Sequence, residues 1–304
     1  MDTKIEGFVP AVVTPFDRNG EILVEDFEAL IEWHLAQGAD SICLAGDNGE
    51  AWTLSLKDRR CIAEAAVRII AGRVPIVMGA STTMAKQSIA YAEIAAEAGC
   101  HALMIGPQSY VMKTTTSELV DRFKAIHAAV PLPMVVYNSP RRTGLNLDPA
   151  MLGAVCDAVP VIGLKEASRD VFHMTEILRD FSDRIAVLVG PCPFILWGIG
   201  MGARGFISSG PELFGTLASR LMAMGRAAPN EEYRRVHNDL TLIYQTLMGT
   251  GTWPSALKAA LSLVGAPAGL PRDPVQSLAG ADLIKLTTVL DGLGLLSEGR
   301  ARGT

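Results

Sequence analysis

The stretch PIVMGASTTMAKQSIAYAEIAAEAGCHALMIG, residues 75–106, contains the pattern that decides the fold. Its two ends, Pro75–Gly79 and Ala102–Gly106, are short apolar runs in which polar residues do not alternate with apolar ones. Such runs are typical of strands that are buried on both faces of a sheet. The residues between them follow a helical period. A strand, a helix and a strand in this order predict two parallel strands joined by a helical crossover.

The same unit recurs along the chain. Six further apolar runs predict strands at Gly7–Thr14, Ser41–Ala45, Met134–Tyr137, Val161–Lys165, Ile185–Val189 and Gly205–Ser208. Between them, apolar residues at 3.6-residue spacing predict amphipathic helices, among them Glu25–Gln37, Leu56–Ala71 and Ser117–Val130. Thr116 and Ser117 are the residue types that cap the start of a helix.

Eight strands alternating with helices favour a closed (β/α)₈ TIM barrel, a fold of roughly 250 residues, over an open doubly wound sheet. We expect the barrel, as the catalytic domain, to span residues 1–210. The remaining residues, 211–304, predict a bundle of helices packed on the barrel and a frayed tail from Ser297. These helices are expected at Leu213–Met224, Glu231–Met248, Ser255–Val264 and Ala281–Leu290.

Composition excludes several classes of protein. Of the 304 residues, 49% are hydrophobic and 19% charged, and the net charge is −5, which excludes a disordered chain and argues against a nucleic-acid partner. The first residues lack the pattern of a signal peptide. The five cysteines are scattered, as in a protein with reduced thiols. The uncharged stretch 185–203 contains two prolines and reads as soluble core. We expect a cytoplasmic protein with no membrane partner.

Two cofactor or metal signals fail in their context. The segment GMGARG, residues 200–205, matches a dinucleotide-binding motif, but it follows a predicted helix and opens a strand, the reverse of the required order. The five histidines have no ligand spacing. We therefore expect no bound metal and no cofactor.

Lys165 is the strongest candidate for a catalytic residue. It closes the run Val161–Leu164, and in barrels of this kind the catalytic groups lie at the C-terminal ends of the strands. Burial there disfavours the ammonium ion and leaves an amine able to attack a carbonyl. A lysine that merely extends its charge to solvent is the alternative. The other seven lysines lie in helical or loop segments, where we expect solvated charges.

Two other strand ends carry polar groups. Tyr137 ends the fifth strand. Its hydroxyl is a candidate proton carrier, or it belongs to a core tyrosine whose hydroxyl merely reaches solvent. An arginine just beyond Tyr137 is a candidate for binding a carboxylate through two parallel hydrogen bonds. The second strand ends in GDNGE, residues 46–50, a turn whose backbone N–H groups can face an anion. An ordinary turn formed by Asp47 and Asn48 is the alternative.

With these residues in place, the chain resembles the dihydrodipicolinate synthase / N-acetylneuraminate lyase family of Schiff-base lyases. The resemblance runs from residue 5 to about 290 and rests on VTPF (13–16), GDNGE (46–50), YNSPRRTG (137–144), GLKEAS (163–168) and GFISS (205–209). It implies a TIM barrel with C-terminal helices, a homo-oligomer (tetramer or dimer), and a covalent imine between Lys165 and pyruvate or another 2-oxo acid.

The resemblance also implies roles for single residues. Tyr137 would carry protons to and from the substrate, and Asn48 and Gly49 would hold the carboxylate of the 2-oxo acid. The backbone carbonyl of Ile207 would lie near the substrate, and Arg142 matches the residue that binds the carboxylate of the second substrate in the synthases.

The chain departs from the synthases at two places. Asp47-Asn48 stands where they carry Thr-Thr, and a charged Asp47 would repel a nearby carboxylate but could bind hydroxyl groups or accept a proton. The tyrosine that a neighbouring subunit donates matches Tyr110 only if its loop is shifted by one residue.

Three functions follow as hypotheses. The first is a Schiff-base lyase that condenses pyruvate with an aldehyde, as dihydrodipicolinate synthase does. The second, motivated by Asp47, is an aldolase or dehydratase for 2-keto-3-deoxy sugar acids. The third is a catalytically silent relative that binds ligands.

Overall fold

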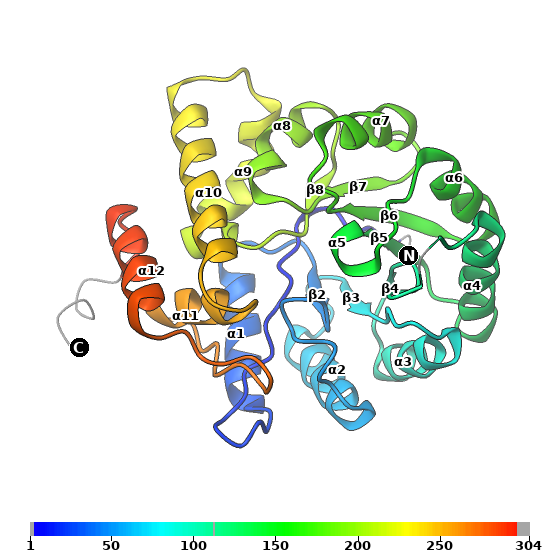
Figure 1. Cartoon of the computed structure of the whole chain (residues 1–304), viewed down its shortest axis with the longest axis horizontal. Coiled ribbons are helices and arrows are strands. Elements are labelled where there is room, and N and C mark those ends of the chain that lie inside the picture. Colours follow the sequence, from blue (N-terminus) through cyan, green and yellow to red (C-terminus); the bar gives the residue numbers. More distant parts are fainter. Residues whose placement is uncertain (1–2, 112, 297–304) are drawn as a thin grey trace.

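The chain folds into a closed barrel of parallel strands surrounded by helices, with further helices at the C-terminal side (Figure 1). The computed structural model describes residues 3–111 and 113–296. Eight strands are found in it: β1 (Gly7–Phe8), β2 (Ile42–Leu44), β3 (Ile76–Gly79), β4 (Ala102–Ile105), β5 (Met134–Asn138), β6 (Val161–Glu166), β7 (Ala186–Val189) and β8 (Gly205–Phe206). All eight predicted strands are therefore present, and the strand–helix–strand unit of residues 75–106 is the one around β3 and β4.

The order of the strands shows that the sheet is closed. Each strand pairs in parallel with its neighbour in sequence from β2 to β8, and β1 pairs with β8. A parallel bridge between Ala11 and Cys43 joins the first strand segment to β2. A doubly wound sheet would reverse its order at a switch point, so the TIM barrel is confirmed and the open sheet is wrong.

The first strand is shorter than the predicted Gly7–Thr14. Regular pairing stops at Phe8 because Pro10 has no N–H to donate. Beyond it the chain still follows β2, with the Cys43 N–H donating to the Pro10 carbonyl at 3.0 Å. The loop that continues to Thr14 is thereby held against the C-terminal end of β2.

Helices follow the strands, and most of them cover the outer face of the barrel (Figure 1). Their bounds are α1 (Val24–Ala36), α2 (Leu56–Ile70), α3 (Ala85–Ala98), α4 (Thr116–Ala129), α5 (Pro140–Thr143), α6 (Pro149–Ala158), α7 (Val171–Phe181), the short 3₁₀ turn η1 (Cys192–Phe194) and α8 (Ile195–Gly200). The GMGARG segment lies between the end of α8 and β8, which confirms that it does not open a helix. No helix among the described residues combines the length and apolarity that a membrane crossing requires.

Side chains at the helix ends explain where two of these helices begin. Ser55 caps α2 and exchanges hydrogen bonds with Asp58 in a capping box. Thr115 and Glu118 form the same arrangement at α4. The cap predicted at Thr116 or Ser117 is therefore one or two residues late, because Thr115 has the glutamate at the third helical position that completes a capping box.

The inside of the barrel is filled by a small apolar cluster, separate from the larger core between strands and helices. Its members are Ile5, Val9, Ala11, Cys43, Val77, Ala102, Met104, Val135, Ala186, Leu188 and Ile207. This packed interior is a floor under the C-terminal ends of the strands. A ligand can therefore bind above it but cannot pass through the barrel.

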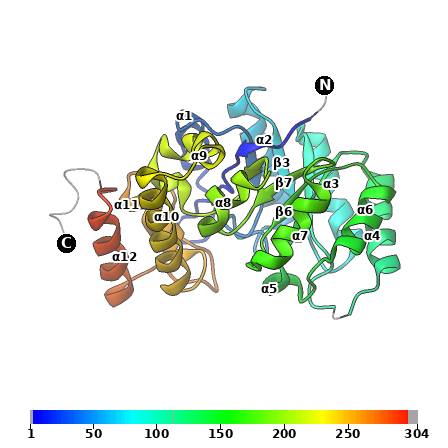
Figure 2. The same ribbon diagram turned by 90° about the horizontal axis from the view of Figure 1, so that it is seen from above.

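The C-terminal helices lie together on one side of the barrel (Figure 2). They are the 3₁₀ turn η2 (Pro211–Phe214), α9 (Leu217–Arg226), α10 (Glu231–Gly249), α11 (Ser255–Leu263) and α12 (Gly280–Gly292). The predicted helix Leu213–Met224 is interrupted at Gly215, which has φ +61°, a backbone conformation that glycine adopts readily. Helix α9 packs on α8 and on β1, so the first C-terminal helix is in contact with the barrel. The domain boundary expected at residue 210 stays a prediction. The tail predicted from Ser297 lies outside the described residues.

Candidate active site

A cavity of about 240 Å³ opens at the C-terminal ends of the strands. Its wall comes from the loops after β2, β7 and β8, from the ends of β5 and β6, and from α10. The sequence-predicted residues that it brings together are Asp47, Asn48, Tyr137, Arg142, Lys165 and Ile207. The residues that the sequence singled out from four different strands thus share one cavity.

Lys165 lies at the base of this cavity and is the penultimate residue of β6. Its side chain is only 7% exposed, and its Nζ atom lies 4.6 Å from the centre of the Tyr137 ring. Among the described hydrogen bonds and ion pairs, none uses this Nζ. The amine is therefore sheltered from bulk water and faces the cavity without a carboxylate bound to it.

Tyr137 is placed beside Lys165 by the pairing of β5 with β6. The two residues are directly opposite each other in the register of the two strands. Neighbouring parallel strands lie about 4.8 Å apart, so side chains on the same face are forced into contact. The position of Tyr137 is therefore fixed by the backbone as well as by side-chain packing.

Asn48 connects the loop after β2 to the loop after β8. Its Nδ2 group donates to the Ala11 carbonyl at 3.0 Å and to the Ser209 hydroxyl at 2.9 Å. The side chain is 4% exposed. These contacts fix the Asn48 amide at the edge of the cavity, where the loop can offer donors to an anion.

Asp47 and Arg142 are paired with each other. The Nε atom of Arg142 lies 2.5 Å from Oδ2 of Asp47, and both side chains are partly exposed. The pair also borders a second cavity of about 510 Å³, which shares Asp47, Arg142 and Tyr137 with the first. This pairing reduces the repulsion expected between Asp47 and a substrate carboxylate. It also means that Arg142 already has a carboxylate partner within the protein.

Two predicted site residues lie away from the cavity wall. Gly49 is buried, and its carbonyl accepts a hydrogen bond from the Thr14 hydroxyl at 2.8 Å. Tyr110 is 94% exposed on the loop after β4 and lines neither cavity. Its expected role in a neighbouring subunit stays a prediction.

A buried polar cluster lies next to Lys165 in the chain. The Nδ2 group of Asn138 donates to Glu166 at 2.7 Å, and His173 Nε2 lies 3.4 Å from the same carboxylate. The hydrogen bond to Glu166 raises the pKa of His173, and burial opposes the effect. From the sequence, His173 is expected in a helical stretch as a surface or helix-packing residue, and it lies buried in α7. The cluster joins the ends of β5 and β6 to α7 and so stabilises the strand ends that carry Tyr137 and Lys165.

A second buried lysine lies in the C-terminal helices, where the sequence predicted only solvated lysines. Lys258 in α11 is 1% exposed, so the expectation that the other seven lysines are solvated is wrong for this residue. Its Nζ atom lies 2.5 Å from the Glu50 carboxylate and donates to the carbonyls of Thr14 and Leu270 at 2.7 Å. The signal in the sequence is that Lys258 is the single charged residue of the apolar helix SALKAALSL, residues 255–263.

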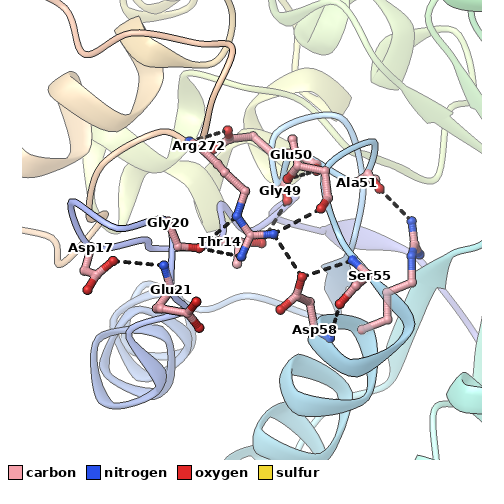
Figure 3. Close-up of polar contacts among 12 residues, drawn as sticks. Thr14, Asp17, Gly20, Glu21, Gly49, Glu50, Ala51, Ser55, Asp58 and Arg272 are labelled. Carbon is pink, nitrogen blue, oxygen red and sulfur yellow. Dashed lines mark hydrogen bonds and ion pairs between the residues drawn. The ribbon is translucent and has the colours of Figure 1, made fainter.

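Arg272 ties the segment before α12 to the same loop (Figure 3). Its backbone N–H donates to Glu50 at 2.9 Å, and its guanidinium pairs with Asp58 and donates to the Gly20 carbonyl. Lys258 and Arg272 thus hold Glu50, the residue that ends the GDNGE turn. The C-terminal region helps to fix the loop that carries Asn48.

The other titratable groups do not suggest a metal centre. Among residues 3–111 and 113–296, no three His, Cys, Asp or Glu side chains gather as metal ligands would. The five cysteines are unbridged. Burial raises the pKa of Cys43 to about 11, an effect that the charge of Lys165 opposes.

Comparison with known proteins shows the same architecture in proteins of one family. Residues 4–292 match the model of the dihydrodipicolinate synthetase family. The 4-hydroxy-tetrahydrodipicolinate synthase of Nitratidesulfovibrio vulgaris (strain DSM 19637 / Miyazaki F) is 33% identical over 295 residues, covering 96% of this chain and 100% of the relative. The enzyme of that name from Exiguobacterium sibiricum is 34% identical, covering 90% of this chain and 94% of its own.

Solved structures agree with these matches. The chloride-inhibited dihydrodipicolinate synthase of Acinetobacter baumannii, complexed with pyruvate, superposes with a TM-score of 0.90 at 27% identity, covering 96% of this chain and 100% of that one. YagE, a prophage protein of the dihydrodipicolinic acid synthase family from E. coli K12 that was also solved with pyruvate, gives a TM-score of 0.89 at 26% identity, covering 96% and 99%. The sequence match over nearly the whole chain, together with the shared barrel, shows that this protein belongs to the dihydrodipicolinate synthetase family of lyases.

Proposed function

We propose that the protein is a Schiff-base lyase that forms an imine between Lys165 and pyruvate or a related 2-oxo acid. The observation that carries this proposal is the position of Lys165, which is 7% exposed at the base of the cavity beside Tyr137. Two structurally similar family members were solved with pyruvate. No cofactor enters the proposed reaction, because the protonated imine formed by Lys165 itself accepts the electrons from C3.

The first steps use the free amine. The Lys165 nitrogen attacks the C2 carbonyl of the 2-oxo acid, a C–N bond forms, and water leaves to give a protonated imine. The positive nitrogen withdraws electrons from C3, so C3 loses a proton and an enamine forms. Attack of this enamine on an aldehyde makes a new C–C bond, and hydrolysis of the imine then restores the amine. The reverse sequence cleaves the bond.

Tyr137 is the residue that we assign to move protons during these steps. General acid–base catalysis requires a group within hydrogen-bond reach of the reacting atoms, and Tyr137 is adjacent to Lys165 in the strand register. The hydroxyl would give a proton to the departing water and take one from C3.

The carboxylate of the 2-oxo acid would bind at the loop after β2. The backbone N–H groups of this loop would supply donors, and Asn48, Ser208 and Ser209 line the same side of the cavity. The carbonyl of Ile207 would face the substrate from the segment just after β8. Donors fixed in advance, as in the loop that Asn48 ties to Ser209, stabilise an anion without reorganisation.

Condensation with an aldehyde, as in 4-hydroxy-tetrahydrodipicolinate synthase, is the finer assignment that the named relatives favour. Cleavage or dehydration of a 2-keto-3-deoxy sugar acid is the second candidate. Asp47 favours it, because a carboxylate at the cavity wall can accept hydrogen bonds from substrate hydroxyl groups.

A substrate panel tests the assignment. Pyruvate consumption is measured with aspartate semialdehyde and other aldehydes, and pyruvate release with 2-keto-3-deoxy sugar acids. We expect turnover of at least one compound by the wild type and none by Lys165→Ala, whereas Lys285→Ala, at an exposed position of α12, keeps wild-type rates. Wild-type rates in Lys165→Ala would refute the lyase mechanism, and a folded wild type without any turnover would favour a ligand-binding relative.

A further inference from the structure

The ends of β5 and β6 carry a second pair of side chains behind the cavity. Tyr137 and Lys165 are directly opposite each other in the strand register, and so are the residues that follow them, Asn138 and Glu166. Successive side chains of a strand point to opposite faces of the sheet. Asn138 and Glu166 are therefore directed away from the cavity, and both are completely buried. Any shift of this outer pair also moves the backbone that carries the inner pair.

Glu166 is held as a carboxylate in this outer position. Its Oε1 atom accepts a hydrogen bond from the Ser168 N–H at 2.7 Å, and its Oε2 atom accepts one from Asn138 Nδ2 at 2.7 Å. Acceptance at both oxygens is what an ionised carboxylate provides. Among the described ion pairs, His173 of α7 is the one partner of Glu166, with 3.4 Å between Nε2 and Oε2. A buried carboxylate is costly for the fold unless a cation lies beside it.

The amide of Asn138 shows which nitrogen of His173 carries hydrogen. Its Nδ2 group donates to Asn146 Oδ1 at 2.8 Å and to Glu166 at 2.7 Å, so both amide hydrogens are used. The contact of 3.2 Å between Nδ2 and His173 Nε2 has no amide hydrogen left. A lone pair on Nε2 would face the Glu166 oxygen, so Nε2 keeps a hydrogen. No described hydrogen bond uses Nδ1, which is therefore the nitrogen that gains or loses the second proton.

The surroundings of His173 favour its charged form. The hydrogen bond to Glu166 raises the pKa of His173, and burial opposes this rise. The charge of Glu166 raises the pKa further, as do the charges of Asp170 and Glu176 in α7 itself. Strand β5 contributes the neutral amide of Asn138. Of the other elements that pack on α7, β7 contains no titratable residue, and α6 contains Cys156 and Asp157, the latter paired with Arg184.

We propose that His173 is a positioning residue of the lyase: its imidazolium balances the charge of Glu166 and so keeps the strand ends in the arrangement that imine formation requires. When the imidazole loses its proton, a buried carboxylate is left without a cation, and the strand ends relax to relieve it. A displacement of about 1 Å at a reacting group can lower a rate by about 10²-fold. The inference rests on the proposed function, because Lys165 is the residue whose reaction His173 supports.

This arrangement should affect the rate of the reaction rather than the affinity for pyruvate. The groups proposed to hold the carboxylate lie in the loop after β2 and at Ser208 and Ser209 after β8, so they belong to other strands. Lys165 and Tyr137 lie on the two strands that the cluster joins. Loss of the His173 charge should therefore lower the maximal rate and leave the half-saturating concentration of pyruvate unchanged.

Deuterium exchange at C3 of pyruvate tests this role without a second substrate. In D₂O, the methyl hydrogens of pyruvate are replaced each time the imine converts to the enamine and back, and proton NMR follows the loss of the methyl signal. The maximal rate and the half-saturating concentration are measured from about pH 6 to about pH 9.5, and spontaneous exchange is subtracted. The charge of His173 is present below its ordinary pKa of 6.5 and is lost as the pH rises through the raised pKa.

Two variants separate the charge of the side chain from its shape. His173→Gln is uncharged at every pH, so we expect its maximal rate to be about tenfold below that of the wild type at pH 6 and equal to it at the upper end of the range, an effect within that of a hydrogen bond to a charged group. His173→Arg keeps its charge, so its rate should stay close to that of the wild type at pH 6 and exceed it at the upper end. Far-UV circular dichroism checks that each variant is folded.

His237→Gln is the matched control. His237 is a half-buried histidine of α10 that borders neither cavity. This variant should follow the wild type at every pH in both the maximal rate and the half-saturating concentration.

The outcomes separate the two proposals. Folded wild-type protein that exchanges no deuterium would refute the imine mechanism, and the role of His173 with it. If the wild type exchanges deuterium but His173→Gln differs from it by the same factor at every pH, or not at all, positioning by charge is wrong and the imine mechanism stands. A raised half-saturating concentration at an unchanged maximal rate would also overturn the inference. If His173→Gln does not fold, the ratio of His173→Arg to the wild type decides, because a ratio independent of pH would show that His173 does not act through its proton.

Discussion

At the scale of single residues, the two buried lysines show how surroundings determine chemistry. Lys258 is held by Glu50 and by two backbone carbonyls, so its ammonium form is bound on several sides. Burial nevertheless lowers its pKa to about 8, and Glu50 opposes the effect. Lys165 contacts the Tyr137 ring and has no described hydrogen bond or ion pair. Only Lys165 has a nitrogen that is free to become a nucleophile at the cavity.

The proton-transfer role of Tyr137 gives the first prediction. Tyr137→Phe removes the hydroxyl and leaves the ring that packs on Lys165, so we expect turnover to fall by about 10²–10⁴-fold, the usual contribution of a positioned acid–base group. The imine should still be trapped by borohydride at saturating pyruvate, more slowly than in the wild type. Turnover within threefold of the wild type would show that another group moves the protons.

Glu212 gives a prediction about pH. Burial raises the pKa of this carboxyl to about 7, although the Gly210 N–H donates to it at 2.8 Å. Because the folded state holds the proton more tightly than the unfolded state, this stabilisation is complete below about pH 4.5 and is lost as the pH rises through about 7. Glu212→Gln carries no charge and should remove the effect.

The measurement is the free energy of unfolding in guanidinium chloride at pH 5 and pH 8. We expect the wild type to lose roughly 2–3 kcal/mol more than Glu212→Gln between these values. Glu64→Gln, at an exposed helix position, should behave as the wild type does. Equal losses in Glu212→Gln and the wild type would contradict the assignment of the pH dependence to Glu212.

At the scale of elements, the ends of the strands carry the candidate site and the C-terminal helices support it. The pattern of apolar runs predicted every strand, because strands buried on both faces need continuous apolar residues. It also placed Lys165 and Tyr137 at strand ends. The contacts of Lys258, Arg169 and Tyr244 could not be predicted, since each depends on which segments meet in three dimensions. Arg169 is separated from Tyr244 by 75 positions, and only the packing of α10 brings them together.

The contact between α11 and the GDNGE turn leads to a third prediction. Lys258→Met leaves Glu50 buried without its partner, so we expect a loss of about 3–5 kcal/mol in the free energy of unfolding. The double variant Lys258→Met/Glu50→Gln should recover part of this loss, because no isolated charge remains. Both are measured by guanidinium denaturation, with the exposed Lys285→Met as the control.

The same variants test whether the ion pair positions the loop. Because Thr14 accepts from Lys258 and donates to Gly49, a loosened loop should weaken pyruvate binding. The concentration of pyruvate that half-saturates trapping should therefore rise in Lys258→Met. An unchanged value, with a lowered stability, would limit the role of Lys258 to folding.

At the scale of the whole molecule, the barrel and the C-terminal helices are connected through buried polar contacts. Lys258 and Arg272 bond to Thr14, Gly20, Glu50 and Asp58, which all lie in the first units of the barrel. The sequence predicted both regions, and the single charge in the apolar helix of residues 255–263 is a signal for a buried lysine, but no pattern identifies the residues that it contacts in the barrel. The order of strands could be predicted because parallel strands with short crossovers pair with their neighbours in sequence.

These connections predict that the molecule unfolds as one unit. We expect far-UV circular dichroism and tryptophan fluorescence to give coincident transitions in guanidinium chloride, since Trp253 lies just before α11 and Trp197 lies in α8. Two separated transitions would show that the C-terminal helices unfold independently. That result would support a domain boundary near residue 210.

Peptide mapping after borohydride reduction tests most directly whether Lys165 forms an imine with a 2-oxo acid. The protein is reduced in the presence of pyruvate, digested, and analysed by mass spectrometry. We predict that the reduced pyruvate adduct is found on the peptide containing Lys165, and that Lys165→Ala carries none. A wild-type protein that remains unmodified at Lys165, or an adduct on Lys258 instead, would contradict the account.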